Sequence, residues 1–171
     1  MNSQISKSQL SDVPALNRLV NSAYRGEESK KGWDTEADLL DGTRTDEELL
    51  AGFISRTDTT ILKYEQDNNL VGCVELRIEG IRLYLGMLSV KPDIQSNGIG
   101  KKLMQAAEMF AREHQCTTIY MTVISVRQKL IEWYQRIGYT FTGERKPFGF
   151  SDPRWGLPKL QLEFVVMEKK L

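Results

Sequence analysis

The chain has 171 residues, 40% of them hydrophobic, and carries 23 basic and 23 acidic side chains. This length fits one domain with a buried core, so we expect a single domain over residues 1–171. The balanced charge argues against nucleic acid or an anionic membrane as a partner, and no apolar run approaches the roughly 20 residues of a membrane span. One histidine and two distant cysteines match no metal spacing, and the polar N-terminus is unlike a signal peptide. These features predict a soluble, cytoplasmic protein without a metal site.

The first third of the chain predicts one strand and two helices. A short polar strand begins at Ile5, and a helix follows an N-cap at Ser11–Asp12. Residues 25–44 are polar and contain glycine, which predicts a loop with room for a helical turn. Thr45, with Glu48 three residues later, forms the pattern of a capping box and predicts the start of the second helix.

Three strands are predicted next, because β-branched and apolar residues alternate between turn-forming residues. They are Thr59–Tyr64, Leu70–Glu79 and Ile81–Val90, with turns at Asp67–Asn69 and Gly80.

The most informative stretch begins where the third of these strands ends. After Pro92 comes a short polar loop with the pattern Gln-x-x-Gly-x-Gly, formed by Gln95, Gly98 and Gly100, and an amphipathic helix starts at once. Backbone N–H groups and the helix dipole at such a place favour an anion. Glycine has no Cβ to block the approach of a phosphate. The loop therefore predicts a site for a cofactor that contains a diphosphate.

The spacing of this loop excludes two common phosphate-binding motifs. A Rossmann fingerprint reads Gly-x-Gly-x-x-Gly, and Gln95 stands where its first glycine would be. A P-loop needs Ser or Thr after its Gly-Lys pair, and here Lys102 follows Lys101.

The last third of the chain predicts alternating strands and helices. They are a helix after the glycine loop, a strand over Thr118–Ile124, a helix over Arg127–Ile137, and strands over Tyr139–Glu144 and Leu162–Met167, with a loop rich in Pro, Gly and aromatic residues over Arg145–Lys159. Hairpins followed by strand–helix–strand passes predict an α/β (α+β) fold. Its centre is a mixed, largely antiparallel twisted sheet of about six or seven strands with helices on both faces.

Two segments together resemble the signatures of the GNAT superfamily of N-acetyltransferases. One is the loop Gln95–Gly100 after its strand; the other is Val126–Tyr139, where a helix carrying Tyr134 is followed by Gly138 and an aromatic residue. The resemblance covers roughly residues 60–145. It implies a GNAT fold and transfer of an acetyl group from acetyl-CoA to a primary amine by direct attack in a ternary complex. The partners that it implies are acetyl-CoA and an amine acceptor, and a homodimer stays possible.

The resemblance also implies roles for individual residues. The cofactor-binding residues would be Leu88, Ser89, Val90, Gln95, Ser96, Asn97, Gly98, Ile99, Gly100, Lys101 and Arg127. Residues 88–90 would pair with the pantetheine arm like an added strand, and the loop would hold the diphosphate mainly through its backbone. Arg127 replaces an asparagine that is common in the family, so it either contacts CoA through its fork of donors or is a solvated residue at a helix start.

Tyr134 occupies the family's usual general-acid position. A phenol stays neutral near pH 7 and is able to protonate a leaving thiolate. The alternative is an aromatic residue that only packs in the core.

The general base stays open among three residues. Glu75 lies in mid-strand among apolar neighbours, where burial would raise the pKa of its carboxyl group. Tyr84 lies on the adjacent strand, near where several family members carry an acidic base. Tyr120 lies on the strand across the cofactor cleft. Each of the three is otherwise an ordinary packed strand residue.

The acceptor is not identified by the sequence. Trp33, with Glu36 and Asp38 in the first loop, and Tyr120 are the candidates for its pocket, together with the late aromatic loop. Small amines, amino acids, polyamines, antibiotics and protein N-termini all stay open. Alternatives to acetyl transfer are another acyl-CoA donor, a noncatalytic CoA-binding regulatory module, and an interaction domain in which the glycine loop is only a turn.

Overall fold

The computed structural model describes residues 2–32, 34–95, 97–148, 154, 157–159 and 161–171. Within these ranges a seven-stranded sheet runs in the order β1-β3-β4-β5-β6-β9-β7, and β2 pairs with β8 in a small second sheet. The strands of the large sheet are β1 (Ser3–Lys7), β3 (Thr59–Gln66), β4 (Asn69–Glu79), β5 (Arg82–Val90), β6 (Thr118–Ile124), β7 (Thr140–Pro147) and β9 (Glu163–Lys170), and those of the small sheet are β2 (Leu40–Asp41) and β8 (Leu157–Pro158).

The large sheet is antiparallel except at its centre, where β5 and β6 run parallel. This arrangement confirms the predicted mixed, largely antiparallel sheet with helices on both faces. No helix in the described part of the chain is long and apolar enough to cross a membrane.

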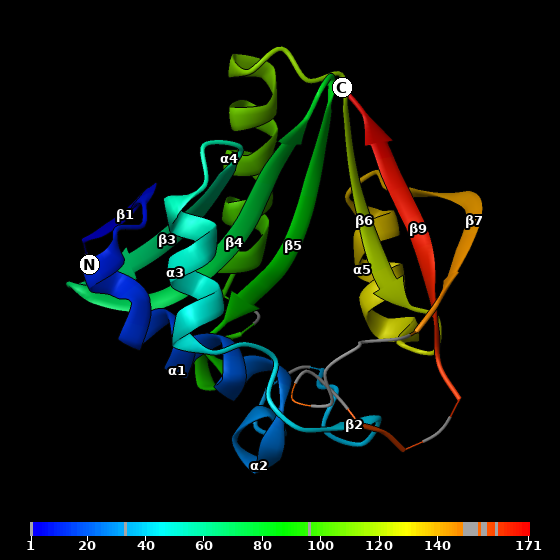
Figure 1. Cartoon of the computed structure of the whole chain (residues 1–171), viewed down its shortest axis with the longest axis horizontal. Coiled ribbons are helices and arrows are strands. Elements are labelled where there is room, and N and C mark those ends of the chain that lie inside the picture. Colours follow the sequence, from blue (N-terminus) through cyan, green and yellow to red (C-terminus); the bar gives the residue numbers. More distant parts are fainter. Residues whose placement is uncertain (1, 33, 96, 149–153, 155–156, 160) are drawn as a thin grey trace.

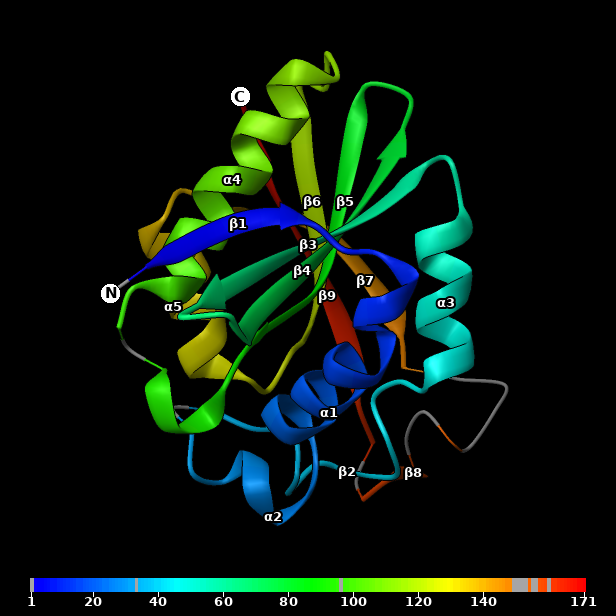
Figure 2. The same ribbon diagram turned by 90° about the vertical axis from the view of Figure 1, so that its left-hand side faces the viewer.

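Helices cover both faces of the sheet, as Figure 2 shows for α3 and α4. They are α1 (Val13–Tyr24), α2 (Gly26–Ser29), α3 (Glu47–Ser55), α4 (Ile99–Glu113) and α5 (Gln128–Arg136). Successive strand residues point to opposite faces, so Ile61 and Cys73 join the core under α1 and α3. Their neighbours Leu62 and Val74 join the core under α4 and α5.

Two details differ from the sequence prediction. The N-cap of α3 is Asp46, whose carboxylate accepts a hydrogen bond from the backbone N–H of Leu49, so the capping box at Thr45 was wrong by one residue. The carboxylate of Asp46 is a stronger acceptor than a neutral hydroxyl for a helix N-terminus. The predicted loop 25–44 contains the short helix α2 and the strand β2.

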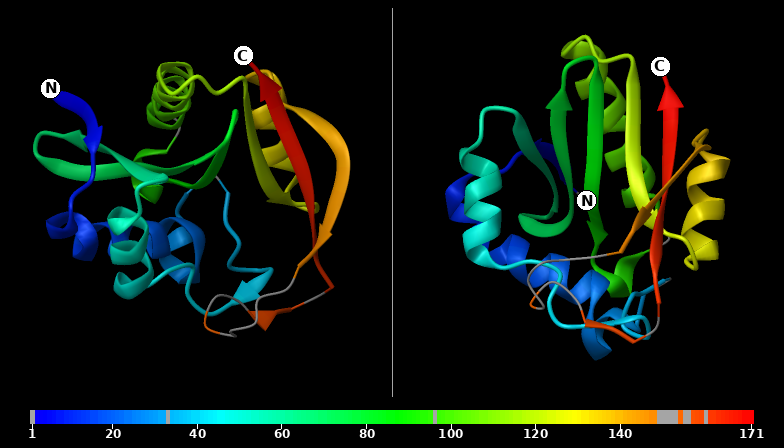
Figure 3. Two further views of the ribbon diagram at one scale, coloured as in Figure 1. Left: turned by 45° about the horizontal axis from the view of Figure 1, so that its top comes forward. Right: turned by 45° about the vertical axis from the view of Figure 1, so that its right-hand side comes forward.

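The sheet opens at its centre, and this opening positions the site. β5 and β6 pair only from Arg82–Thr118 to Tyr84–Tyr120, and beyond these pairs the two strands spread apart (Figure 1). β5 also shifts register against β4 near Met87, whose φ of 55° is left-handed. Such a bulge bends its strand and frees backbone groups from the ladder. The segment after α1 lies between the two halves of the sheet (Figure 3), where Arg127, just after β6, bonds Asp34 and Glu36.

Candidate functional site

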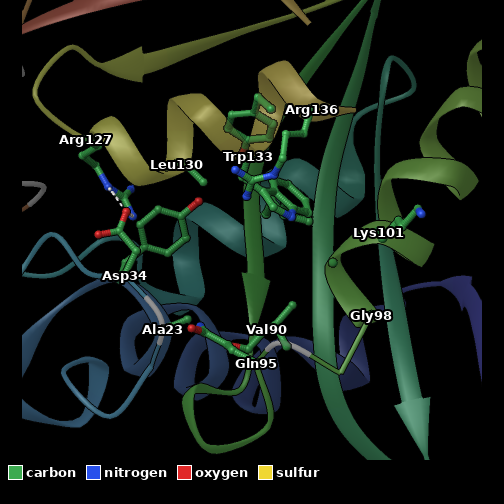
Figure 4. Close-up of a pocket in the computed structure, with 14 residues that line it drawn as sticks. Ala23, Asp34, Val90, Gln95, Gly98, Lys101, Arg127, Leu130, Trp133 and Arg136 are labelled. Atoms are coloured by element: carbon green, nitrogen blue, oxygen red, sulfur yellow. Dashed lines mark hydrogen bonds and ion pairs between the residues drawn. The ribbon is translucent and has the colours of Figure 1, made fainter. Parts of the chain in front are cut away.

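The first cavity lies beside the end of β5, the N-terminus of α4 and one face of α5. Its volume is about 410 Å³. It is lined by Ala23, Tyr24, Asp34, Leu88, Val90, Gln95, Gly98, Gly100, Lys101, Arg127, Leu130, Trp133, Tyr134 and Arg136. Figure 4 shows the paired Arg127 and Asp34 at one end, and Gly98 and Lys101 at the other. The cavity therefore joins the two segments that the sequence singled out.

The glycine loop is built as its sequence predicts. Gly98 is the N-cap of α4 and has a φ of 80°, in the left-handed region that glycine adopts at no steric cost. Among the described residues, a Cβ placed there would meet nothing within 4 Å, so this backbone faces open space. A Cβ at Gly100 would lie 3.5 Å from the ring of Trp133. A larger side chain at this position would therefore collide with that indole.

Other residues of the predicted cofactor set differ in how they meet the cavity. The side-chain amide of Gln95 donates to the carbonyl of Val90 at 2.9 Å, which fixes the loop to the strand end. Asn97 is exposed, and Ile99 is buried in the core. Ser96 lies outside the described residues.

The end of β5 presents alternate side chains to the cavity. Leu88 and Val90 line it. Ser89 is 2% exposed, and its hydroxyl donates to the carbonyl of Met87 at 3.0 Å on the opposite face. Any role of Ser89 toward a ligand is therefore limited to its backbone.

A second cavity, of about 330 Å³, is also lined by Tyr134. Its lining residues come from the sheet opening, α1, α3, α5, the first loop, the end of β7 and the start of β9. They are Tyr24, Arg25, Glu36, Arg44, Leu49, Phe53, Glu75, Arg77, Tyr84, Leu85, Gly86, Met87, Leu88, Met121, Thr122, Val123, Ile124, Arg127, Leu130, Tyr134, Phe148 and Phe164. The two cavities share Tyr24, Leu88, Arg127, Leu130 and Tyr134. Ligands in both would thus meet at these five side chains.

Tyr134 is 5% exposed and lines both cavities. Its ring packs edge-on against Trp133 and Tyr139, with centroids 5.2 and 5.9 Å away. Burial raises the pKa of its hydroxyl well above the ordinary value. The phenol is therefore a neutral donor at any physiological pH.

Arg127 is neither solvated nor free to bind a ligand with all its donors. Its side chain is 9% exposed; Nε and Nη2 donate to Asp34 at 3.2 and 3.0 Å, and Nη1 donates to Glu36 at 3.1 Å. The other oxygen of Glu36 accepts from Arg25 at 2.8 Å. Arg127 thus holds the segment after α1 across the sheet opening, a role that neither sequence interpretation included.

We expect Arg127→Gln to lower the free energy of unfolding by about 3–5 kcal/mol. The reason is that Asp34 would lose its cation, and Glu36 would keep only its ion pair with Arg25. Urea denaturation measures this. The control is Arg112→Gln on the exposed face of α4, where an i,i+4 pair with Glu108 at 3.7 Å contributes little. Equal losses of stability in the two variants would contradict the conclusion that Arg127 holds the segment after α1 across the sheet opening.

Glu75 is 4% exposed and lines the second cavity. Its Oε1 is buried and has no hydrogen-bond partner among the residues that the structure describes, and Arg77 Nη1 lies 3.9 Å from it, beyond hydrogen-bonding distance. Burial raises the pKa of this carboxyl group, and the charges of Arg44 and Arg77 oppose the rise. A carboxylate with a raised pKa and an unused oxygen is suited to accept a proton near neutral pH.

Tyr84 lines the same cavity, and burial raises the pKa of its hydroxyl. Its ring lies under Arg77, 4.4 Å from the guanidinium carbon. A Cβ at Gly86 would stand 2.7 Å from the Tyr84 hydroxyl, so the absent side chain at Gly86 provides the room for this ring.

Tyr120 lies elsewhere than the sequence predicted. Its hydroxyl donates to Glu79 at 2.6 Å, its ring packs under Arg82, and it lines neither cavity. Tyr120 pairs with Tyr84 in the last pair of the β5–β6 ladder, and the two rings lie 5.4 Å apart, but the hydroxyl of Tyr120 is bound to Glu79 and does not face a cavity. We therefore withdraw Tyr120 as a base and as an acceptor-pocket residue.

Sequence reasoning missed several residues that line the first cavity, namely Tyr24, Asp34, Leu130, Trp133 and Arg136. For Trp133 and Arg136 the signal was available, because Leu130, Trp133 and Arg136 follow one another at three-residue spacing along one face of α5. Of the residues expected in the acceptor pocket, Glu36 lines the second cavity, Asp38 pairs with Lys30 at 3.5 Å, and Trp33 lies outside the described residues.

Comparisons with known proteins agree with this geometry. Residues 15–139 match the model of the Acetyltransferase (GNAT) family. A search of curated protein sequences finds no match. Three similar solved structures share the fold at low sequence identity. The ribosomal-protein-S18-alanine N-acetyltransferase of Escherichia coli has a TM-score of 0.73 at 14% identity, over 99% of this chain and 94% of that one.

The second is the PaiA N-acetyltransferase of Thermoplasma acidophilum in complex with coenzyme A, with a TM-score of 0.72 at 21% identity over all of both chains. The third is the ribosomal-protein-alanine N-acetyltransferase of Brucella melitensis, with a TM-score of 0.71 at 20% identity over 98% of this chain and 99% of that one. At these identities the similarity supports the fold and leaves the substrate open.

Proposed function

Since the chain belongs to the acetyltransferase (GNAT) family, we propose that it transfers an acetyl group from acetyl-CoA to a primary amine by direct attack in a ternary complex. The observation that carries the proposal is the meeting of two cavities at Tyr134, one beside the glycine loop and one beside Glu75. A donor and an acceptor bound in these cavities would approach each other at that side chain.

The residues of the first cavity suit the chemistry of acetyl-CoA. The glycine loop and the N-terminus of α4 suit a diphosphate, and Lys101 and Arg136 add positive charge. Leu88 and Val90 offer an apolar wall and unpaired strand backbone to a pantetheine arm. CoA supplies the thioester, and the protein binds and orients it.

In the proposed reaction the amine nitrogen attacks the thioester carbonyl carbon, so that a C–N bond forms and the C–S bond breaks. Glu75 accepts the proton that the amine loses, directly or through one water. The Tyr134 hydroxyl donates a hydrogen bond to the leaving sulfur and supplies its proton. Because the pKa of this phenol lies well above that of a thiol, stabilisation of the developing thiolate by the hydrogen bond is its main contribution.

Calorimetry with acetyl-CoA and with CoA tests the donor site, and a screen of amines with detection of released CoA tests transfer. Micromolar binding followed by amine-dependent CoA release would support the proposal. Binding without turnover of any amine would favour a noncatalytic CoA-binding module. Faster turnover with a longer acyl-CoA would favour another donor, and absence of binding to either ligand would refute the proposal.

We expect Tyr134→Phe to lower kcat about 10- to 100-fold, since a hydrogen bond to a charged group contributes about 1.5–3 kcal/mol. The KM for acetyl-CoA should change little. The matched control is Tyr139→Phe, which removes a buried hydroxyl that has no partner and lines neither cavity. An unchanged kcat in Tyr134→Phe would refute its role as the acid.

A further inference from the structure

The second cavity holds a charge pattern that the transfer reaction alone does not require. Its charged lining residues are Arg25, Arg44, Glu36, Glu75, Arg77 and Arg127. Three of the arginines already have close carboxylate partners, because Arg25 and Arg127 share Glu36 and Arg77 bonds Glu79 at 2.8 Å.

Arg44 differs from the other three. In the described part of the chain its guanidinium forms no ion pair or hydrogen bond, and its recorded contact is the face of Tyr24, 5.2 Å from the ring centroid. The backbone N–H of Arg44 donates to Asn21 Oδ1 at 2.8 Å, which anchors the residue at the end of the first loop. The structure thus aims a half-buried cation into the cavity and leaves its donors unused.

Glu75 is the matching carboxylate, because its ion pair with Arg77 is long, at 3.9 Å between Oε1 and Nη1, and leaves Oε1 without a hydrogen bond in the described part of the chain. It is not within ion-pair distance of Arg44, yet Arg44 opposes the burial-induced rise in the pKa of Glu75 more strongly than Arg77 does. The two groups therefore face one cavity without neutralising each other directly. Buried charges are normally paired, so a cation and a carboxylate held apart in one cavity indicate a ligand that carries both opposite charges.

We propose that the acceptor is a small amine that also carries a carboxylate, with the carboxylate bound by Arg44 and the amine held beside Glu75. This inference rests on the proposed function and names its substrate class. Arginine presents a planar fork of donors that matches a carboxylate in two parallel hydrogen bonds. An ammonium group beside Glu75 becomes the nucleophile once that carboxylate takes its proton.

The size and the walls of the cavity narrow the class further. A volume of about 330 Å³ lies at the small end of ligand pockets and suits a molecule the size of an amino acid. Leu49, Phe53, Phe148 and Phe164 supply apolar surface in the same cavity. The class therefore includes free amino acids with apolar side chains and excludes polyamines, which bring no anion for Arg44.

The test compares acceptors that differ only in the anion. Phenylalanine, phenylalanine amide and phenethylamine form one set, and leucine, leucine amide and isopentylamine form another. We expect kcat/KM to be at least tenfold higher for the acids, although the amides have the less basic amines and so more free base. Amides or amines that react as well as the acids, or acids that do not react at all, would overturn the inference.

Arg44→Gln gives the second readout. We expect it to raise the KM for the acids at least tenfold and to leave the KM for the amides unchanged, whereas Arg18→Gln on the exposed face of α1 should change neither. An equal loss for acids and amides would show that Arg44 only supports the fold. If Arg44→Gln fails to fold, the inference is tested by Arg44→Lys and by the comparison of acids with amides and amines in the wild-type protein.

Binding of acetyl-CoA, measured by calorimetry on each variant, distinguishes a failure of the substrate class from a failure of the proposed transfer. Retained binding without any preference for acids overturns the substrate class alone. Loss of binding in the wild-type protein would instead refute the proposed acetyl transfer.

Discussion

Gly98→Asp is expected to abolish binding of acetyl-CoA while the protein remains folded. The φ of 80° at this N-cap is one that Asp and Asn tolerate better than other residues. A Cβ there enters open space beside the first cavity, so no atom of the protein has to move. The new carboxylate would stand where we propose the diphosphate lies, and two like charges 4 Å apart repel by about 1 kcal/mol in water and about 4 kcal/mol near a protein surface. Calorimetry with CoA measures the loss.

Gly98→Asn is the matched control, because the amide has nearly the same size and backbone preference without the charge. We expect the affinity of Gly98→Asn to exceed that of Gly98→Asp at least tenfold, and added salt to narrow the difference. Near-equal affinities of the two variants would mean that the side chain acts by its bulk. Wild-type affinity in Gly98→Asp would place the cofactor somewhere other than this loop.

The features of the proposed donor side of the site are local in sequence, and for that reason they were predictable. A strand, a loop and a helix N-terminus within Leu85–Leu103 follow from hydrophobic periodicity and two glycines. The strands and helices of the large sheet likewise follow from patterns of a few residues. The predicted and observed ends of these elements differ by up to a few residues, as in the strand expected over Leu162–Met167 and found over Glu163–Lys170.

The proposed acceptor side depends on contacts between distant residues, and a single sequence does not reveal them. Arg127 pairs with Asp34 and Glu36, which are 93 and 91 residues away, and each of these charged residues alone is typical of a solvated surface. The hydrogen bond that turns the Tyr120 hydroxyl toward Glu79, 41 residues away, is likewise a long-range contact. Beyond the Tyr84–Tyr120 pair, Gly86 on β5 is the one glycine or proline in the two strands that could mark where they separate. Its role, to leave room for the Tyr84 ring, is visible only in the structure.

Glu75→Gln is expected to lower kcat/KM about 100- to 10,000-fold at neutral pH, the usual contribution of a positioned general base. Wild-type kcat/KM should rise with pH through the raised pKa of Glu75, and this limb should vanish in the variant. A second rise at higher pH, where the free amine forms, should remain in both proteins. Tyr84→Phe is the comparison, because burial raises the pKa of Tyr84 and keeps its phenol protonated, so it is unable to accept the proton at neutral pH. A larger loss in Tyr84→Phe than in Glu75→Gln would reverse the assignment.

The stability of Glu75→Gln should change in the opposite sense to its activity. A carboxyl group whose pKa is raised in the folded state binds its proton more tightly there than in the unfolded chain. Its contribution to stability is therefore present at low pH and is lost as the pH rises from the unfolded to the folded pKa. Urea denaturation from about pH 4 to about pH 8 should thus show the variant gaining on the wild type over that interval and holding a constant difference above it. If the stabilities of the variant and the wild type change in parallel with pH, the pKa of Glu75 is not raised. The rise of kcat/KM with pH would then have to come from another group. A residue kept in the core as a charge at a cost to stability, with one oxygen unused, is the expected signature of a group retained for chemistry.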